Sequence, residues 1–174
     1  MPRPMQALIP PRGALLPPLS KDAVLDNKKA IRGGIPLVFP QFGKWELGPN
    51  HGFARISTWT LAEQGETPEG DVYAVFQLCD SDATRKMWDH AFELRYTVTL
   101  GKTRLSTSLS IENKGSAAFD FQTLLHTYFR VPSVSEAAVG GLRGVHYRNQ
   151  VGVRGMWRRG DGAPLEAGAA CAPG

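Results

Sequence analysis

Four histidines are the side chains of this chain that are best suited to transfer protons near neutral pH, because imidazole alone titrates there without perturbation. They stand at positions 51, 90, 126 and 146. Their spacing matches no metal-binding pattern, and no cysteine or acidic cluster accompanies them, so we expect no metal site. His90, beside Asp89, and His146 are predicted to be structural. His126 is the first candidate for proton transfer because of the run that contains it.

In the run FDFQTLLHTYF, residues 119–129, side chains of different character alternate between the two faces of a predicted strand. One face is formed by Phe119, Phe121, Thr123 and Leu125, and the other by Asp120, Gln122, Leu124, His126 and Tyr128. The second face repeats hydrogen-bonding groups, as the floor of a ligand groove would. It could equally be the solvent-facing side of an edge strand, and the pattern alone does not decide between the two. In a groove, His126 could be held in one tautomer and donate a proton.

Further candidates lie in residues 21–55, where glycines and prolines interrupt every possible helix. This part is predicted to be a shaped loop region with one short apolar strand over residues 35–39. It contains Arg32 in the sequence IRGG, and His51 and Arg55 in the sequence NHGFAR. Taken singly, a loop histidine is more often a local hydrogen-bonding residue than a catalyst, and an isolated arginine is usually solvated.

The elements that must position these residues are strands. From Phe53 onward the chain predicts five of them, over residues 53–63, 72–79, 91–100, 103–113 and 118–129. The segment FELRYTVTL shows the apolar and polar alternation of a half-buried antiparallel strand. Gly101 and Lys102 suit a tight turn into the next strand, so this pair is predicted to be a hairpin. The expected fold class is all-β and antiparallel.

Composition and charge limit the classes of function. The formal net charge is +4 and the isoelectric point is about 9.3, which suits phosphate-bearing ligands without indicating nucleic acid. No glycine-rich phosphate loop precedes a helix, so ATP and NAD are not expected. No apolar run approaches the roughly 20 residues that span a bilayer, and prolines interrupt the start of the chain. The two cysteines form no disulfide framework, and we predict a cytoplasmic protein without membrane contact.

Three segments of different character divide the chain. Residues 1–20 are rich in proline and are predicted to be irregular. Residues 21–148 form the predicted β domain. Residues 149–174 contain many glycines and alanines with little alternation, and are predicted to be an unrelated, flexible tail.

Four separate motifs carry a resemblance to a known family. They are AIRGGIPLVFPQFG, PNHGFAR, DHAFELRYTVTL, and LLHTYFRVPSV with GLRGVHY, and together they extend over about residues 20–148. Their order and spacing resemble the hexose-6-phosphate mutarotase branch, the glucose-6-phosphate 1-epimerases, of the aldose 1-epimerase superfamily. The resemblance implies an antiparallel β-supersandwich of the galactose mutarotase-like kind, here incomplete, with sugar bound in a concave groove.

The resemblance also assigns roles to residues. It implies that His126 is a general acid on the ring oxygen of the sugar, while a carboxylate takes the proton of the anomeric hydroxyl. It implies that Arg32 and Arg55 bind the substrate, where guanidinium groups suit a phosphate, and that Gln41 and His51 line the groove. The expected activity is interconversion of the α and β anomers of glucose 6-phosphate or similar hexose 6-phosphates, without a cofactor.

The resemblance implies further strands beyond the GLRGVHY segment, one of which supplies the carboxylate, and we expect that segment to be missing here. The expectation is therefore an isomerase by ancestry whose activity is weakened or lost. The alternative is a noncatalytic protein that binds sugar phosphates, for which Arg32 and Arg55 suffice. A third reading, in which the arginine-rich tail contacts nucleic acid, ranks last because the tail has few aromatic residues, so no nucleic-acid partner is expected.

Overall fold

The computed structural model describes residues 29–133 without a break. It also describes residues 6–7, 19, 23–25, 146–148 and 157–159. The chain divides into two units, Met1–Tyr128 and Phe129–Gly174, and each unit is described by itself.

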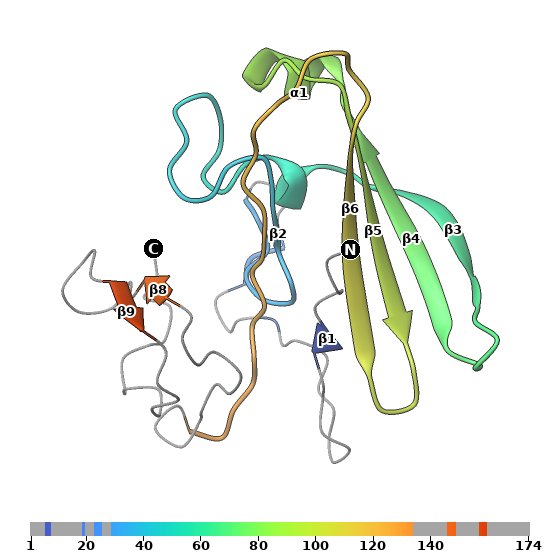
Figure 1. Cartoon of the computed structure of the whole chain (residues 1–174). Coiled ribbons are helices and arrows are strands. Elements are labelled where there is room, and N and C mark those ends of the chain that lie inside the picture. The colour runs from blue at the N-terminus through green and yellow to red at the C-terminus, as the bar shows by residue number, and fades with distance from the viewer. Residues whose placement is uncertain are drawn as a thin grey trace. The chain divides into compact units, whose positions relative to one another are not determined.

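A five-stranded antiparallel sheet dominates the first unit (Figure 1). Its spatial order is β1, β6, β5, β4, β3. The strands are β1 (Gln6–Ala7), β3 (Thr60–Glu66), β4 (Val72–Cys79), β5 (Phe92–Leu100) and β6 (Leu105–Asn113).

The hairpin of β5 and β6 confirms the predicted turn. Leu100 pairs with Leu105, and the N–H of Gly101 donates to the carbonyl oxygen of Arg104 at 2.9 Å. Apolar residues alternate along β5 as predicted, and Phe92 and Leu94 at its start are fully buried. The sheet therefore has one face committed to a core at this end.

A second layer of aromatic packing covers this buried end of the sheet. The ring of Phe39 lies 5.4 Å from the ring of Phe92, and Phe53 stacks on Phe92 at 5.6 Å. Phe39 directly follows β2 (Leu37–Val38), which pairs with β7 (Leu124–Leu125) in a separate two-stranded sheet. The core thus holds the two segments that carry the candidate site residues against the large sheet.

Beyond both ends of the β2–β7 pair, the backbones are joined by single hydrogen bonds, each donated by the segment that contains β7. The N–H of Gln122 donates to the carbonyl oxygen of Pro40 at 2.7 Å, and the N–H of His126 donates to that of Pro36 at 3.0 Å. A full antiparallel pair exchanges two hydrogen bonds, but proline has no N–H to return. The predicted strand over 118–129 is therefore reduced to the two residues of β7, although its backbone keeps the antiparallel register.

The predicted strand over 53–63 is wrong in its first half. The N–H groups of Phe53 and Ala54 both donate to the carbonyl oxygen of Phe39, at 3.0 and 3.3 Å, and the chain forms a short 3₁₀ helix, η1 (Ala54–Ile56). The strand begins only at Thr60. The strands predicted over 72–79, 91–100 and 103–113 are confirmed within two residues at each end, as β4, β5 and β6.

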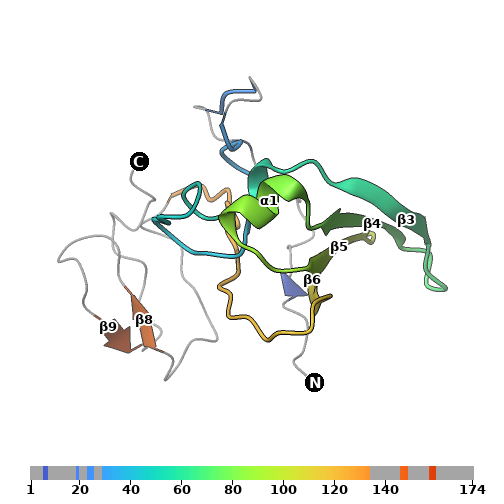
Figure 2. The ribbon, with the colours of Figure 1, turned by 90° about the horizontal axis from the view of Figure 1, so that it is seen from above.

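One short helix, α1 (Asp82–Met87), was not predicted. It connects β4 to β5, and Figure 2 shows it at the end of the sheet where β4 ends. Ser81 caps it: the side chain of Ser81 accepts from the N–H of Thr84, and the side chain of Thr84 accepts in return from the N–H of Ser81. Six residues are too few to show a helical period in the sequence.

The second unit contains β8 (His146–Arg148) and β9 (Trp157–Arg159), which form an antiparallel pair. The predictions of an irregular segment over 1–20 and a flexible tail over 149–174 fall almost entirely outside the described residues. Within the described ranges, no helix is long and apolar enough to span a bilayer.

Candidate functional site

The loop of residues 41–51 brings His51 back to β2 through a close approach of two backbones. Gly52 has a φ of +74° and forms a parallel bridge with Phe39. A Cβ atom at Gly52 would overlap the carbonyl group of Phe39 and lie 2.8 Å from the nitrogen of Pro40. Only glycine fits both the backbone angle and the space. His51, just before it, is also left-handed, with a φ of +67°.

The ring of His51 is fixed by the same loop. The N–H of His51 donates to the carbonyl oxygen of Gly43 at 2.8 Å, and the N–H of Gly43 donates to Nδ1 of His51 at 3.0 Å. Because Nδ1 is an acceptor, the proton of the neutral imidazole lies on Nε2. His51 therefore offers an N–H donor at Nε2.

Three effects keep His51 neutral. Burial lowers its pKa, and the positive charges of Arg55 and His126 lower it further. A second proton on the ring would also have to displace the hydrogen bond from Gly43. At neutral pH His51 is therefore an uncharged hydrogen-bond donor.

His126 lies beside His51, on the segment that follows β7. The centroids of the two imidazole rings are 6.2 Å apart, and the ring of Tyr128 lies 5.2 Å from that of His126 on the same segment. The N–H of Tyr128 donates to the carbonyl oxygen of Gly34 at 3.0 Å, which continues the register with β2. His126 and Tyr128 thus occupy alternate positions of one extended segment, as the sequence predicted.

Arg55 completes this group of side chains. Its Nη2 donates to the carbonyl oxygen of Asn50 at 2.8 Å, and its Nε is buried without a hydrogen-bond partner in the described part of the chain. Burial lowers the pKa of Arg55, and the nearby Tyr128 acts in the opposite direction. An unpaired, buried guanidinium N–H is costly in the empty protein and is suited to an oxygen of a ligand.

An open hollow of about 290 Å³ lies on one side of Arg55. Its lining is mostly apolar and includes Ile31, Gly33, Pro36, Ser57 and Trp59. The hollow does not reach His51 or His126, so the cluster of polar side chains, and not this hollow, defines the candidate site. Arg32 is exposed, and its two neighbours in the sequence, Ile31 and Gly33, line the hollow.

Gln41, the first residue of the loop 41–51, is held by the side chain of Gln122. Its Nε2 donates to Oε1 of Gln122 at 3.1 Å, and the same oxygen accepts from the N–H of Phe42 at 3.0 Å. Gln122 therefore ties the loop to the segment that carries His126. The ring of Phe42 in turn packs on His51 at 5.1 Å.

The structure brings together three of the five predicted site residues, His51, Arg55 and His126, and adds Tyr128 to them. Gln41 is joined to the same framework through Gln122. Neither Gln122 nor Tyr128 was selected from the sequence, although both stand on the polar face of the predicted strand. Their alternation with His126 was the signal that could have identified them.

This site cluster (His51, Arg55, His126 and Tyr128) combines two imidazole groups, one fixed positive charge and the aromatic ring of Tyr128. In the part of the chain that the structure describes, no carboxylate forms a hydrogen bond or ion pair with these four residues. Among the described residues, no group of three or more His, Cys, Asp or Glu side chains could hold a metal ion. The cluster suits an anionic or hydroxyl-rich ligand.

The antiparallel sheets and the structures they resemble place the chain among the galactose mutarotase-like all-β proteins. In the crystal structure of a "putative mutarotase" from Salmonella typhimurium, 33% of aligned residues are identical and the TM-score is 0.65. The match covers 74% of this chain and 42% of that one. A protein of Synechocystis sp. PCC 6803 has a TM-score of 0.74 over 94% of this chain and 66% of its own, and its 22% identity supports the fold alone.

Sequence comparison gives the family. Residues 15–164 match the family described as aldose 1-epimerase, so the chain belongs to that family. A protein of Escherichia coli (strain K12), named "Putative glucose-6-phosphate 1-epimerase", is 39% identical over 126 residues. A protein of Cenchrus ciliaris with the same name is 34% identical over 136 residues. These matches cover 71% and 74% of this chain but 41% of each relative, so the chain spans about two fifths of their length.

Proposed function

We propose that this chain binds a hexose 6-phosphate and assists the interconversion of its α and β anomers, with His126 as the general acid. The observation that carries the proposal is the contact of His126 with a neutral histidine donor and with Tyr128, beside the guanidinium group of Arg55. Membership of the aldose 1-epimerase family and the names of the relatives support the substrate class.

Each residue has a distinct task in this proposal. His126 donates a proton to the ring oxygen of the sugar as the bond between C1 and that oxygen breaks, and a solvent water molecule takes the proton of the anomeric hydroxyl. The aldehyde end rotates, and when the ring closes on the other face the ring oxygen returns its proton to His126 while the C1 oxygen regains a proton from solvent. His51 remains neutral and donates from Nε2 to a sugar oxygen, which holds the substrate while the charge of His126 changes.

The phosphate is assigned to Arg55, with Arg32 as a second candidate from the resemblance. A phosphate oxygen would satisfy the unpaired Nε of Arg55 and would restore a counter-charge that the described residues do not provide. Gln41, tied to Gln122, is assigned to the rim of the groove. No cofactor is required for this chemistry.

A second candidate function is binding without turnover. Ring opening also needs a base for the proton of the anomeric hydroxyl, and no described carboxylate contacts His51, His126 or Arg55. A chain with the acid alone would bind sugar phosphates and leave their anomers to exchange at the spontaneous rate.

Exchange spectroscopy by NMR separates the two functions. The exchange rate between the α and β anomers of glucose 6-phosphate is measured with and without the chain, and binding is followed in parallel by calorimetry. Acceleration over buffer, absent with unphosphorylated glucose at the same concentration, supports the mutarotase. Binding without acceleration supports the second candidate, and the absence of both contradicts the proposal.

A further inference from the structure

Among the described residues, the imidazole of His126 contacts two other rings and forms no side-chain hydrogen bond. In most sites that use histidine as an acid, a carboxylate or a carbonyl oxygen holds one ring nitrogen and fixes the tautomer and the angle of the ring. In the described part of the chain, the side chain of His126 has no such partner, and its contacts are with the rings of His51 and Tyr128.

The two neighbouring rings approach His126 in different ways. His51 meets it edge to face, with the centroids 6.2 Å apart and the planes at 70°. Tyr128 lies closer, with the centroids 5.2 Å apart and the planes tilted by 30°. Rotation of the imidazole about the Cβ–Cγ bond would therefore change its angle to both neighbouring rings.

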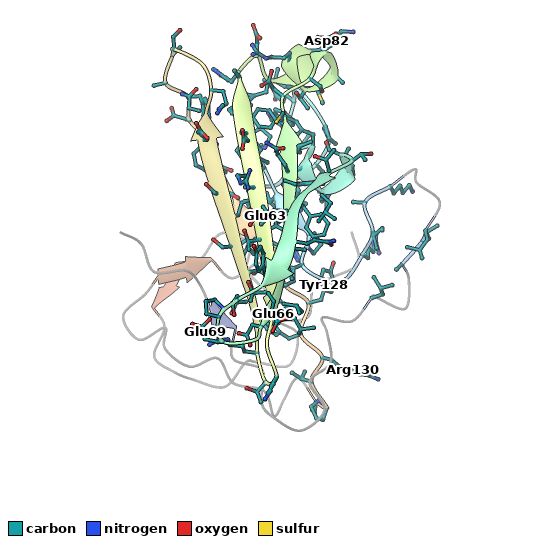
Figure 3. All side chains as sticks on the ribbon, turned by 90° about the vertical axis from the view of Figure 1, so that its right-hand side faces the viewer. Glu63, Glu66, Glu69, Asp82, Tyr128 and Arg130 are labelled. Carbon is teal, nitrogen blue, oxygen red and sulfur yellow. The ribbon has the colours of Figure 1, made fainter. Side chains whose placement is uncertain are left out.

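Both ends of the contact between His126 and Tyr128 are anchored on the same backbone ladder. The backbone N–H of His126 donates to the carbonyl oxygen of Pro36, and the backbone N–H of Tyr128 donates to that of Gly34, each at 3.0 Å. The side chains of alternate residues in an extended segment lie on one face. Here both backbone hydrogen bonds are accepted by residues just before β2. Figure 3 labels Tyr128, on the segment that follows β7.

We propose that Tyr128 is a positioning residue for His126, whose ring holds the imidazole at the angle needed for proton transfer to the sugar. This inference rests on the proposed function for its catalytic consequence. It assigns the role to the ring and not to the hydroxyl group, because the phenol oxygen makes no hydrogen bond with the described residues.

The test compares Tyr128→Phe, which keeps the ring, with Tyr128→Leu, which removes it. Displacement of a catalytic group by about 1 Å costs on the order of 100-fold in rate. We therefore expect Tyr128→Leu to lower kcat for anomer exchange by about 10- to 100-fold with KM changed less than about threefold. Tyr128→Phe should remain within about threefold of the unmodified chain in both constants.

Two further variants guard against a merely structural effect. Tyr73→Leu makes the same substitution on β4, where the hydroxyl group of Tyr73 bonds to Glu63 at 2.6 Å, and it should leave kcat unchanged. Tyr128→Met also removes the flat ring but leaves a longer, flexible side chain that can fill irregular gaps, and it replaces Tyr128→Leu if that variant does not fold. Urea unfolding of each variant shows which of them are folded.

The same variants have a readout that does not depend on activity. With isotope-labelled histidine, the ring signals of His126, identified by their loss in His126→Ala, should show contacts to the ring at position 128 in Tyr128→Phe. In Tyr128→Leu and Tyr128→Met these signals should move and average. If the unmodified chain shows no exchange catalysis, the proposed function fails while this measurement still decides the positioning role.

Two results overturn the inference. One is a folded Tyr128→Leu or Tyr128→Met whose kcat and His126 signals match those of the unmodified chain. The other is a Tyr128→Phe that loses as much kcat as Tyr128→Leu, since the hydroxyl group and not the ring would then be required.

Discussion

The close approach at Gly52 predicts a large loss of stability on substitution by alanine. Two costs combine at this position. A left-handed backbone costs a residue with a Cβ about 1 to 2 kcal/mol, and the φ of Gly52 is +74°. The added methyl group would overlap the carbonyl group of Phe39, and overpacking of this kind costs about 1 to 3 kcal/mol. We expect Gly52→Ala to reduce the free energy of unfolding by about 2 to 5 kcal/mol.

Gly43→Ala is the matched control. Gly43 has nearly the same φ, +76°, and belongs to the same loop, but nothing lies within 4 Å of an added Cβ. It should lose only the backbone cost of about 1 to 2 kcal/mol. Comparison of the two variants therefore isolates the contact between the loop and β2.

Urea unfolding followed by circular dichroism measures the difference. With a urea dependence of about 1 to 3 kcal/mol per molar, the midpoint of Gly52→Ala should fall about 1 M below that of Gly43→Ala. A Gly52→Ala variant that does not fold, beside a folded Gly43→Ala, agrees with the expectation. Equal midpoints for the two variants would refute the close approach, and with it the way in which His51 is brought beside His126.

Three further predictions concern the binding site, the helix and acid stability. Arg55→Lys should raise KM for glucose 6-phosphate about tenfold with a smaller change in kcat, because lysine has no counterpart of Nε; an unchanged KM in NMR exchange measurements would remove Arg55 from the phosphate site. Ser81→Ala should cost about 1 kcal/mol in urea unfolding through loss of the cap of α1, and no loss relative to Ser110→Ala on β6 would contradict the capping role. The hydrogen bond from Arg85, aided by the N–H of Phe92, lowers the pKa of Asp80 below its ordinary value of 3.8. The stabilisation by Asp80 is therefore present above pH 3.8 and is lost as the pH falls through the folded-state value. Asp80→Asn should flatten the decline of the urea midpoint in acid, and a decline as steep as that of the unmodified chain would contradict this cause.

The central strands could be predicted because their sequence pattern and their environment agree. In β5, apolar residues at every second position match a strand with one buried face, and Gly101 ends it at a turn. The family, and the fold class with it, could also be predicted, because four motifs in order are specific where each alone is weak. The predicted cytoplasmic location and the residue boundaries of the three segments remain predictions.

The missed elements depend on backbone partners that are distant in the sequence. The segment 118–129 has the composition of a strand, but its pairing partner contains Pro36 and Pro40, and the loss of their N–H groups becomes visible only when the two segments are paired. Likewise, Phe53 turns away from a strand because the carbonyl oxygen of Phe39 accepts two hydrogen bonds at this point.

The candidate site was predictable in its residue types but not in its arrangement. The polar face of the segment 119–129 identified His126, and the resemblance added His51 and Arg55. The neutral state of His51 follows from the hydrogen bond that Gly43 donates to Nδ1, which no local pattern announces. The alternation of residues 126 and 128 placed Tyr128 and His126 on one face, but it did not indicate that their rings are in contact.

The most direct test of the account compares His126→Ala with His90→Ala in the NMR exchange of glucose 6-phosphate anomers. The ring of His90 packs on Trp88 at 4.5 Å and on Phe119 at 5.3 Å, outside the site cluster. His90→Ala is therefore a control that also removes an imidazole packed against aromatic rings. The account predicts acceleration by the unmodified chain and by His90→Ala, and the spontaneous rate with His126→Ala. Acceleration that survives in His126→Ala would contradict the assignment of His126 as the acid.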